Sequence, residues 1–445
     1  MTLTAPPLLA AGHRGPTAGI VLVTTLLGFE EMAVGTALPT VARSLDGLAL
    51  YAWGFSATLI ATLLATVLAG GWTDRRGPAR PVLTGLALFT AGLAAAGAAP
   101  SMPVFVAGRA VQGLGAGTTL VALYVLIARA YPDALRPRVF AALAAAWVVP
   151  SLAGPALAGL ITDHAGWRWV FLGLIPLVVP AAALLVPALR TLPPAPTGDG
   201  RSAPARDRRR TGAAVAVAAG AAVLLYALDH PRALPLGIAG LAGLGFGLPR
   251  LLPAGTLRLR RGLPSIVLAR GLMGGAFFGT NAFIPLALTG LHGFSPTQAG
   301  VALTSGAIAW SAAAQYQGRS SRPQAFFAVL GAVLLAAGVA GAALAAQASG
   351  WAVAPVWALG GAGMGCATGA LSVLLLGASP DGAQGVHSSA LQIGDTLGSA
   401  LLIGASGAVL SAFGSRLAPG LAVAGLLCTA VAVLAVIAAR RLETS

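Results

Sequence analysis

Two adjacent acids, Glu30 and Glu31, lie near the middle of a hydrophobic segment that covers residues 17–41. About 20 apolar residues in a helix cross the ~30 Å hydrocarbon layer of a bilayer, so this segment is long enough to span one. An ionised carboxylate at that depth costs at least ~2.5 kcal/mol, and such groups face a water-filled cavity or an opposite charge. We therefore expect the two acids to bind a proton, an ion or a cationic substrate. The alternative is a structural ion pair between one acid and an arginine of another helix.

Polar residues also interrupt two later apolar segments. Arg109 and Gln112 lie one turn apart in the fourth segment, and Asp395 follows Gln392 in the penultimate one. We expect Gln112 and Gln392 to line the substrate cavity together with the acids. A buried arginine must meet an acid, a carbonyl or water. Asp395 is the only acid deep in the C-terminal half, and we predict that it is a second protonation or substrate site. The alternative is a paired structural acid.

Two further polar residues lie in the apolar segment 265–290. Asn281 is a weaker candidate for the substrate cavity. Arg270 is nearer the end of the segment, and we expect its long side chain to extend to the membrane surface while its stem stays in lipid.

The composition supports a membrane location for these groups. The chain has 445 residues, of which 57% are hydrophobic and 9% charged, and its mean hydropathy is +0.85. Soluble domains carry about 25% charged residues. Lipid accommodates only helices or closed barrels, and continuous apolar runs of about 20 residues predict helices. The chain is therefore predicted to be an all-α polytopic membrane protein.

Fourteen apolar segments divide the chain into three parts. They cover residues 17–41, 51–70, 81–99, 103–128, 138–161, 168–189, 211–228, 234–252, 265–290, 297–316, 324–346, 351–377, 385–411 and 418–439. Residues 1–190 and 265–445 are predicted to form two six-helix bundles with the substrate site between them, as in many transporters. Residues 191–264 are predicted to hold two additional central spans and cytoplasmic linkers, the first of them flexible and extending to Arg210.

The net charge of +15 predicts topology rather than a nucleic-acid partner. All 27 basic residues are arginines, and most lie in short loops on alternate sides of the apolar segments. Cytoplasmic loops carry such an excess, so we expect a protein of the cytoplasmic (inner) membrane with both termini in the cytoplasm. A chain of twelve spans, without the central pair, would have its termini on the same side of the membrane. The charge pattern alone therefore does not distinguish twelve spans from fourteen. The first segment is too long for a cleaved signal peptide and is expected to remain as an anchor.

The chain carries no motif for enzyme or cofactor chemistry. It has no HExxH, CxxC, paired acidic metal motif or phosphate loop, and Cys366 and Cys428 both lie in apolar segments. We expect no enzymatic activity, cofactor, metal site or disulfide, with the proton gradient as the energy source.

The short loop after the second segment concentrates charge. It reads GGWTDRRGPARP and contains Gly70, Asp74, Arg75, Gly77 and Arg80. Gly70 is expected to let its helix approach a neighbour closely, and Asp74 to lie near a helix N-terminus or pair with an arginine. Such a cluster can latch two half-bundles. The alternative is an ordinary positively charged turn.

The fifth segment combines proline with glycine at Pro150, Gly154, Pro155 and Gly159. Proline removes a backbone donor and bends a helix, and glycine lets another helix pack against the bend. We expect a kinked helix with a close interhelical contact. The alternative is the general glycine and proline content of membrane helices.

These motifs together resemble signatures of the major facilitator superfamily. The loop resembles G-x-x-x-D-R-x-G-R-R, although Pro78 and Ala79 replace two basic residues, so its latch is expected to be weaker. GRAVQGLGAG resembles the helix-4 motif R-x-x-Q-G, in which the arginine, here Arg109, is tied to proton coupling. WVVPSLAGPALAGL resembles the antiporter signature G-P-x-x-G-G, with Ala158 at one glycine position.

The first segment resembles the helix-1 motif L-D-x-T-x-V-N-x-A-L-P of the fourteen-helix drug:proton antiporters. This alignment puts Glu30 at the position of the acid and Gly35 at that of the asparagine. Helical periodicity instead puts Glu31 on a small polar stripe with Gly28 and Gly35, because adjacent residues lie about 100° apart. The motif favours Glu30 and leaves Glu31 as the alternative. One acid is expected to line the cavity while the other makes an interhelical contact.

The resemblance implies proton-coupled efflux by rocking of the two bundles. Expected partners are protons, the bilayer and a small-molecule substrate, and a largely apolar cavity favours amphipathic, cationic drugs or metabolites. Protonation of Glu30, Glu31 or Asp395 would release substrate, and Arg109 would modulate their proton affinity. The chain is expected to act as a monomer. The alternatives are a proton symporter that imports a nutrient and a carrier of lipid-like metabolites on the same fold.

Overall fold

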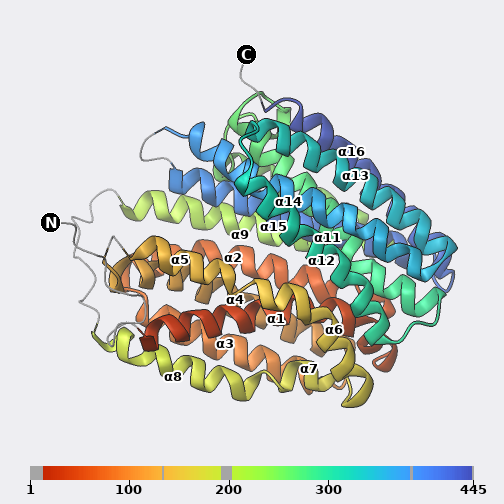
Figure 1. Cartoon of the computed structure of the whole chain (residues 1–445), viewed down its shortest axis with the longest axis horizontal. Coiled ribbons are helices and arrows are strands. Elements are labelled where there is room, and N and C mark those ends of the chain that lie inside the picture. Colours follow the sequence, from red (N-terminus) through yellow and green to blue (C-terminus); the bar gives the residue numbers. More distant parts are fainter. Residues whose placement is uncertain (1–13, 133–134, 192–202, 381–383, 443–445) are drawn as a thin grey trace.

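The computed structural model describes residues 14–132, 135–191, 203–380 and 384–442, and within these ranges the chain is helical without strands (Figure 1). The first group of helices is α1 (Arg14–Ser44), α2 (Trp53–Arg76), α3 (Ala79–Gly97), α4 (Met102–Ala130), α5 (Arg136–Ala145), α6 (Val148–His164), α7 (Arg168–Leu172) and α8 (Ile175–Thr191). The central pair is α9 (Ala203–Asp229) and α10 (Leu234–Leu251). The last group is α11 (Leu263–Leu291), α12 (Pro296–Arg319), α13 (Gln324–Ala348), α14 (Val353–Gly377), α15 (Gln384–Ala412) and α16 (Leu417–Ala439). Single-turn 3₁₀ helices lie in the connections at η1 (Leu48–Leu50), η2 (Pro231–Ala233), η3 (Thr256–Arg258) and η4 (Gly350–Ala352).

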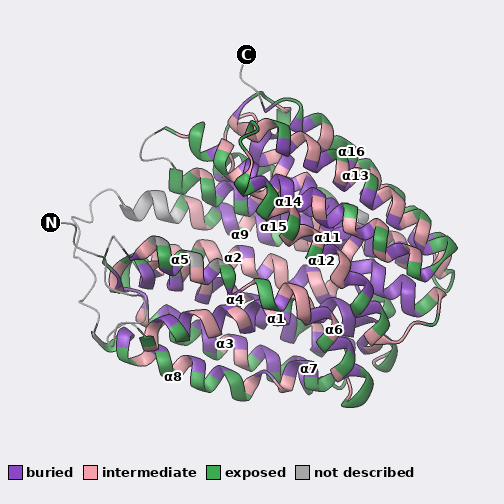
Figure 2. Cartoon of the chain, in the orientation of Figure 1, coloured by how far each residue is buried: buried purple, intermediate pink, exposed green. Residues whose placement is uncertain are grey.

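The prediction of an all-α, multi-pass membrane protein is confirmed. Eleven stretches of described helix are long and apolar enough to cross a membrane. They do not include α10, α12 or the α5–α6 stretch, so the count of fourteen spans remains a prediction. Burial separates central from peripheral helices (Figure 2): 78% of the most apolar window of α11 is buried, against 33% for α16. Hence α11 lies inside the bundle and α16 at its rim.

The predicted continuous spans 138–161 and 168–189 are both broken, which corrects two helix boundaries. The first break separates α5 from α6 at Ala146 and Trp147. The ring of Pro150 would clash with the carbonyl four residues earlier, that of Ala146. This carbonyl accepts a hydrogen bond from the Thr25 hydroxyl at 3.3 Å, so a neighbouring helix supplies its partner. In the second span the helix stops at Leu172, four residues before Pro176, for the same reason.

The first linker is shorter than predicted. Residues 192–202 lie outside the described residues, and α9 already begins at Ala203, so residues 203–210 are helical rather than flexible linker. Glycine then holds the two central helices together. A Cβ atom on Gly240 would lie 2.7 Å from the backbone nitrogen of Leu224, and one on Gly220 would lie 2.8 Å from the carbonyl oxygen of Gly240. The α9–α10 pair is therefore a tight helical hairpin.

The central hairpin packs against helices of both groups. Figure 1 shows α9 beside α2, and α9 also contacts α15. One apolar cluster joins Leu63 of α2, Val217 of α9 and Leu397 of α15. The hairpin thus connects the first and last groups of helices and does not lie apart from them.

The two groups also contact each other directly, through α2 with α15 and through α6 with α12. We name the two ends of the bundle by their loops. The arginine-rich face carries the start of α1, the end of α16, and the α2–α3, α4–α5, α10–α11 and α12–α13 connections. The ends of α1 and α6 and the starts of α2 and α12 lie at the opposite face.

Candidate functional site

A buried polar cluster ties together α1, α2 and α4. The Arg109 guanidinium pairs with the Glu30 carboxylate, and its Nη1 donates to Gln112 Oε1 at 2.9 Å. Arg109 Nε donates to the carbonyl oxygen of Gly54 at 3.0 Å, and Gln112 Nε2 donates to Glu30 Oε1 at 3.3 Å. Each of Glu30, Arg109 and Gln112 is at most 4% exposed. The arginine thus meets both an acid and a carbonyl, the partners expected for a buried guanidinium.

Glycines on α4 bring the neighbouring helices close enough to form this cluster. A Cβ atom on Gly113 would lie 2.2 Å from the carbonyl oxygen of Thr58, and one on Gly117 would lie 2.6 Å from that of Thr62, both on α2. Gly115 faces α3, where its Cβ would lie 2.3 Å from the backbone nitrogen of Phe89. Backbone atoms cannot yield as side chains do, so these positions require glycine for the observed packing.

Glu31 has a different environment from its neighbour. It is exposed although it lies in the middle of α1, and Asp395 of α15 is near enough for the two negative charges to repel each other. Glu31 therefore points towards the last group of helices, while Glu30 points towards α4. A Cβ on Gly35, one turn further along the same stripe, would meet nothing within 4 Å. Glu30 makes the interhelical contact, and Glu31 lies on an open face of α1.

A second ion pair, which is partly buried, lies in the last group of helices. Arg270 of α11 donates from Nη2 to Asp395 Oδ2 of α15 at 2.9 Å. The expectation that Arg270 extends to the membrane surface is wrong, because an acid on the neighbouring helix holds it inside. Asp395 Oδ1 and Arg270 Nη1 are buried and have no hydrogen-bond partner among the described residues. A Cβ on Gly274 would lie 2.0 Å from Asp395 Oδ1, so glycine makes room for this carboxylate.

Two predicted cavity residues belong to neither ion pair. Gln392 is exposed and reaches only Thr396 on its own helix, at 3.5 Å. Asn281 is half-buried and makes no hydrogen bond with the described residues. It lies about 16 Å along α11 from Arg270, since each residue of a helix rises 1.5 Å. The structure thus brings Glu30, Arg109 and Gln112 together, and separately pairs Asp395 with Arg270.

The charged α2–α3 loop differs from its prediction in one respect. Asp74 and Arg75 are exposed in the last turn of α2, and Arg80 is exposed in the first turn of α3. Gly77 ends α2 with φ +75°, a conformation that favours glycine, and a Cβ there would lie 2.9 Å from Arg129 Nη1. A Cβ on Gly70 would meet nothing within 4 Å. The predicted close helix approach at Gly70 is therefore wrong, because none of the described residues lies within 4 Å of the face that Gly70 presents.

The proline and glycine motif of α6 contacts α1 and α12. A Cβ on Gly154 would lie 3.1 Å from Met32 of α1. One on Gly159 would lie 2.5 Å from the carbonyl oxygen of Pro296, and one on Gly300 would lie 2.2 Å from that of Pro155. Two helices from different groups thus approach to backbone contact at this motif.

Sequence reasoning missed the hydrogen bonds between the two groups. Asp163 at the end of α6 accepts bonds from the backbone nitrogen of Thr297 at 3.0 Å and from its hydroxyl at 2.5 Å. Tyr51 donates to the carbonyl oxygen of Ala282 at 2.7 Å, and Ser56 to that of Ala400 at 3.0 Å. The sequence Ser-Pro-Thr-Gln at residues 295–298 does signal a helix start with free N–H groups, but not which acid meets them. These bonds lie towards the opposite face.

Two groups of membrane-crossing helices that face each other are the arrangement of transporters built from two related halves. The family profile described as "Major Facilitator Superfamily" matches residues 20–402. The chain belongs to this superfamily of transporters.

Curated relatives match part of the chain. An uncharacterised transporter of the superfamily from Mycobacterium tuberculosis is 33% identical over 209 residues, covering 44% of this chain and 30% of that protein. A probable multidrug-efflux transporter of the same organism is 34% identical over 169 residues, covering 38% and 35%. The chain thus spans about a third of the length of the curated relatives that it matches.

Solved structures match the fold over nearly the whole chain. A POT family transporter in complex with a thioalcohol-conjugated peptide has a TM-score of 0.70 at 14% identity, and the match covers 99% of both chains. A D-xylose–proton symporter has a TM-score of 0.68 at 16% identity, covering 97% of this chain and 98% of that one. At these identities the likeness establishes the fold alone.

Proposed function

We propose that the chain exports amphipathic, cationic compounds across the cytoplasmic membrane in exchange for protons. The observation that carries this proposal is the contrast between the two adjacent acids. Glu30 is buried with Arg109 and Gln112, whereas Glu31 is exposed and lies within the field of the like charge of Asp395 in the other group. A carboxylate that is accessible between the groups can bind either a proton or a cation, and the two compete for it.

The buried pairs are proposed to position these acids. Arg109 holds Glu30 by charge and holds α2 through the carbonyl of Gly54, so α1, α2 and α4 move as one body. Arg270 holds Asp395 in the last group. A cationic substrate that approaches Glu31 and Asp395 would compete with Arg270 for the carboxylate of Asp395, and protonation of either acid would weaken its hold on the cation.

Alternating access is proposed to occur by separation of the two groups at the opposite face. The bonds of Asp163 with Thr297, Tyr51 with Ala282 and Ser56 with Ala400 hold the groups together there. Their positions support a state that is closed at this face, with access from the arginine-rich face. The positive-inside rule makes the arginine-rich face cytoplasmic. The two bundles (residues 1–190 and 265–445), the role of the α2–α3 loop as a latch, and action as a monomer are parts of the same proposal.

The proposal is tested by proton movement in liposomes that contain the purified protein and a pH dye inside. Lipophilic cations and neutral amphiphiles of similar size are added outside, without a pH gradient. Antiport predicts that entering cations drive protons out of the liposomes, so that the interior becomes more alkaline. Proton movement in the same direction as the compound would instead identify a symporter. Cation movement without proton movement would show that transport is not coupled to protons.

The matched control is Asp46→Asn. Asp46 is exposed in a connection at φ +48°, a conformation that asparagine also adopts, so this variant removes one acid outside the helices. It is expected to transport like the unaltered chain, whereas Glu31→Gln is expected to lose substrate-driven proton movement.

A further inference from the structure

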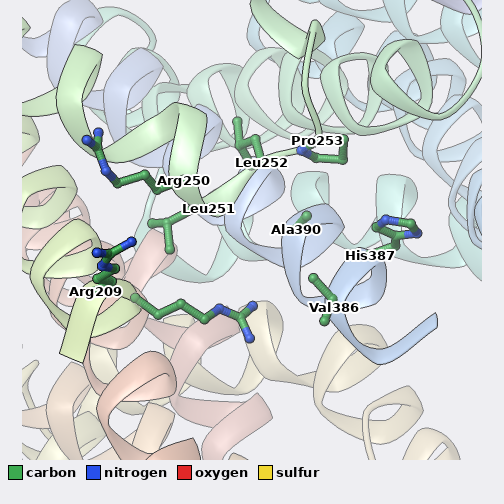
Figure 3. Close-up of a pocket in the computed structure, with 9 residues that line it drawn as sticks. Arg209, Arg250, Leu251, Leu252, Pro253, Val386, His387 and Ala390 are labelled. Atoms are coloured by element: carbon green, nitrogen blue, oxygen red, sulfur yellow. The ribbon is translucent and has the colours of Figure 1, made fainter. Parts of the chain in front are cut away.

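A basic pocket lies where the ends of α9, α10 and α15 meet, at the arginine-rich face (Figure 3). Its volume is about 350 Å³. Nine residues line it: Arg209, Arg210, Arg250, Leu251, Leu252, Pro253, Val386, His387 and Ala390. In Figure 3, Arg209 and Arg250 lie on one side of the pocket and His387 on the other, with Leu251 and Leu252 between them.

The lining combines positive charge with an absence of acids. Three of the nine residues are arginines, and none is an aspartate or glutamate. Within the part of the chain that the structure describes, Arg209 and Arg210 form no hydrogen bond or ion pair. Arg250 stacks its guanidinium over the ring of Phe246, with 3.8 Å from Cζ to the ring centroid. Arg209 and Arg210 both line the pocket, where an anion would meet their guanidinium groups.

The pocket lies at the end of a stretch of α9 that is long and apolar enough to cross a membrane. The membrane-crossing stretch of α9 begins at Arg209, and Arg250 lies in the last turn of α10. On α10, the exposed side chains of Ile238 and Phe246 are apolar, as expected for a helix that borders lipid. The pocket thus joins arginines at the membrane boundary to apolar walls that continue into the hydrocarbon layer.

We propose that this pocket binds the phosphate of an anionic phospholipid, with Arg209 and Arg210 as its ligands and the leucines and Val386 against the upper acyl chains. Basic pockets between transmembrane helices on the cytoplasmic side take such headgroups. Arginine suits a phosphate because its planar fork forms two parallel hydrogen bonds. A bound lipid would connect the central hairpin to α15, which already share an apolar contact through Val217 and Leu397. The proposal is independent of the direction of transport.

The test is titration of the full-length protein, in neutral detergent, with three probes. These are a short-chain phosphatidylglycerol, a short-chain phosphatidylcholine and inorganic phosphate. Saturable binding of the phosphatidylglycerol is expected, with markedly weaker binding of the other two. Equal affinity for phosphatidylglycerol and inorganic phosphate would overturn the lipid assignment, because the acyl chains would then contribute nothing.

Variants locate the site. The double variant Arg209→Gln with Arg210→Gln is expected to weaken phosphatidylglycerol binding about tenfold or more, since charged hydrogen bonds are lost. Replacement of both by lysine keeps the charge but not the fork, and an intermediate loss is expected. The control Arg319→Gln with Arg322→Gln removes the same charge from another connection of the same face, and both side chains are exposed. If the control and the pocket variant weaken phosphatidylglycerol binding equally, the loss comes from general surface charge. That result would overturn the proposed site.

Discussion

Glu30 and Glu31 are chemically identical and adjacent, yet among the described residues Glu30 contacts an arginine and Glu31 does not. The separation of their roles follows from the helical step of about 100°, so it could be predicted from sequence. Their partners could not, because the order of helices in space decides which arginine each acid meets. The partner of Arg270 could not be predicted either. Its position in α11 is compatible with a side chain at the membrane surface and with one that pairs with Asp395 inside the bundle. The available signal was an acid in the middle of one span and an arginine near the end of another span of the same half.

At this scale, Glu30→Gln is expected to be far more destabilising than Glu31→Gln. The first leaves the buried Arg109 charge without its carboxylate, which costs about 3–5 kcal/mol of folding free energy. The second changes an exposed side chain and is expected to cost about 0.5 kcal/mol or less. Melting temperatures of the purified variants in detergent, followed by tryptophan fluorescence, measure the difference. Equal melting of the two variants would contradict the assignment of Glu30 to the buried cluster.

At the scale of the element, proline placement explains the main differences between predicted and observed spans. Hydropathy predicted where the helices lie but treated residues 138–161 as one helix. Pro150 breaks this helix, because its ring would clash with the carbonyl of Ala146. The glycine motif was correctly expected to make a close contact. Its partner, the start of α12, belongs to the other half of the chain, and no local pattern identifies it.

Gly300→Ala is expected to disrupt the contact between α6 and α12. The added Cβ would lie 2.2 Å from the carbonyl oxygen of Pro155, a backbone atom, so overpacking should cost about 1–3 kcal/mol. Gly318→Ala is the matched control on the same helix, because its Cβ would meet nothing within 4 Å. Gly318 is the penultimate residue of α12, so alanine there is expected to change the free energy of unfolding by about 0.5 kcal/mol or less. Thermal unfolding should therefore shift down in Gly300→Ala and stay nearly unchanged in Gly318→Ala, and equal shifts would contradict the observed packing.

At the scale of the whole molecule, the two groups of helices contact each other towards the opposite face, and the central hairpin packs against both. The sequence predicted the groups and the hairpin from hydropathy and charge. It could not predict that α9 packs on α2 and α15, because the small and apolar residues of α9 suit many neighbours. The hydrogen bond between Asp163 and Thr297 could not be predicted from the sequence either. It forms only when the two groups are in contact at the opposite face.

Asp163→Ala is expected to populate separation of the groups at the opposite face. Loss of its bonds to Thr297 should shift the equilibrium by about twofold to tenfold, because each net hydrogen bond contributes about 1 kcal/mol. Spin labels on cysteines at Ala165 and Ser349, in a chain with Cys366 and Cys428 replaced by serine, report the distance across this face. A longer-distance population should grow in Asp163→Ala and not in Asp46→Asn. An unchanged distribution would show that this contact does not hold the groups together.

The central claim is that a proton and a cationic substrate compete for Glu31. The most direct measurement is proton release when tetraphenylphosphonium binds the purified full-length protein in weakly buffered detergent solution, read with a pH dye. We predict release from the unaltered chain and from Asp46→Asn, and none from Glu31→Gln at any concentration of the cation. Release from Glu31→Gln equal to that of the unaltered chain would contradict the account and move the proton to another group.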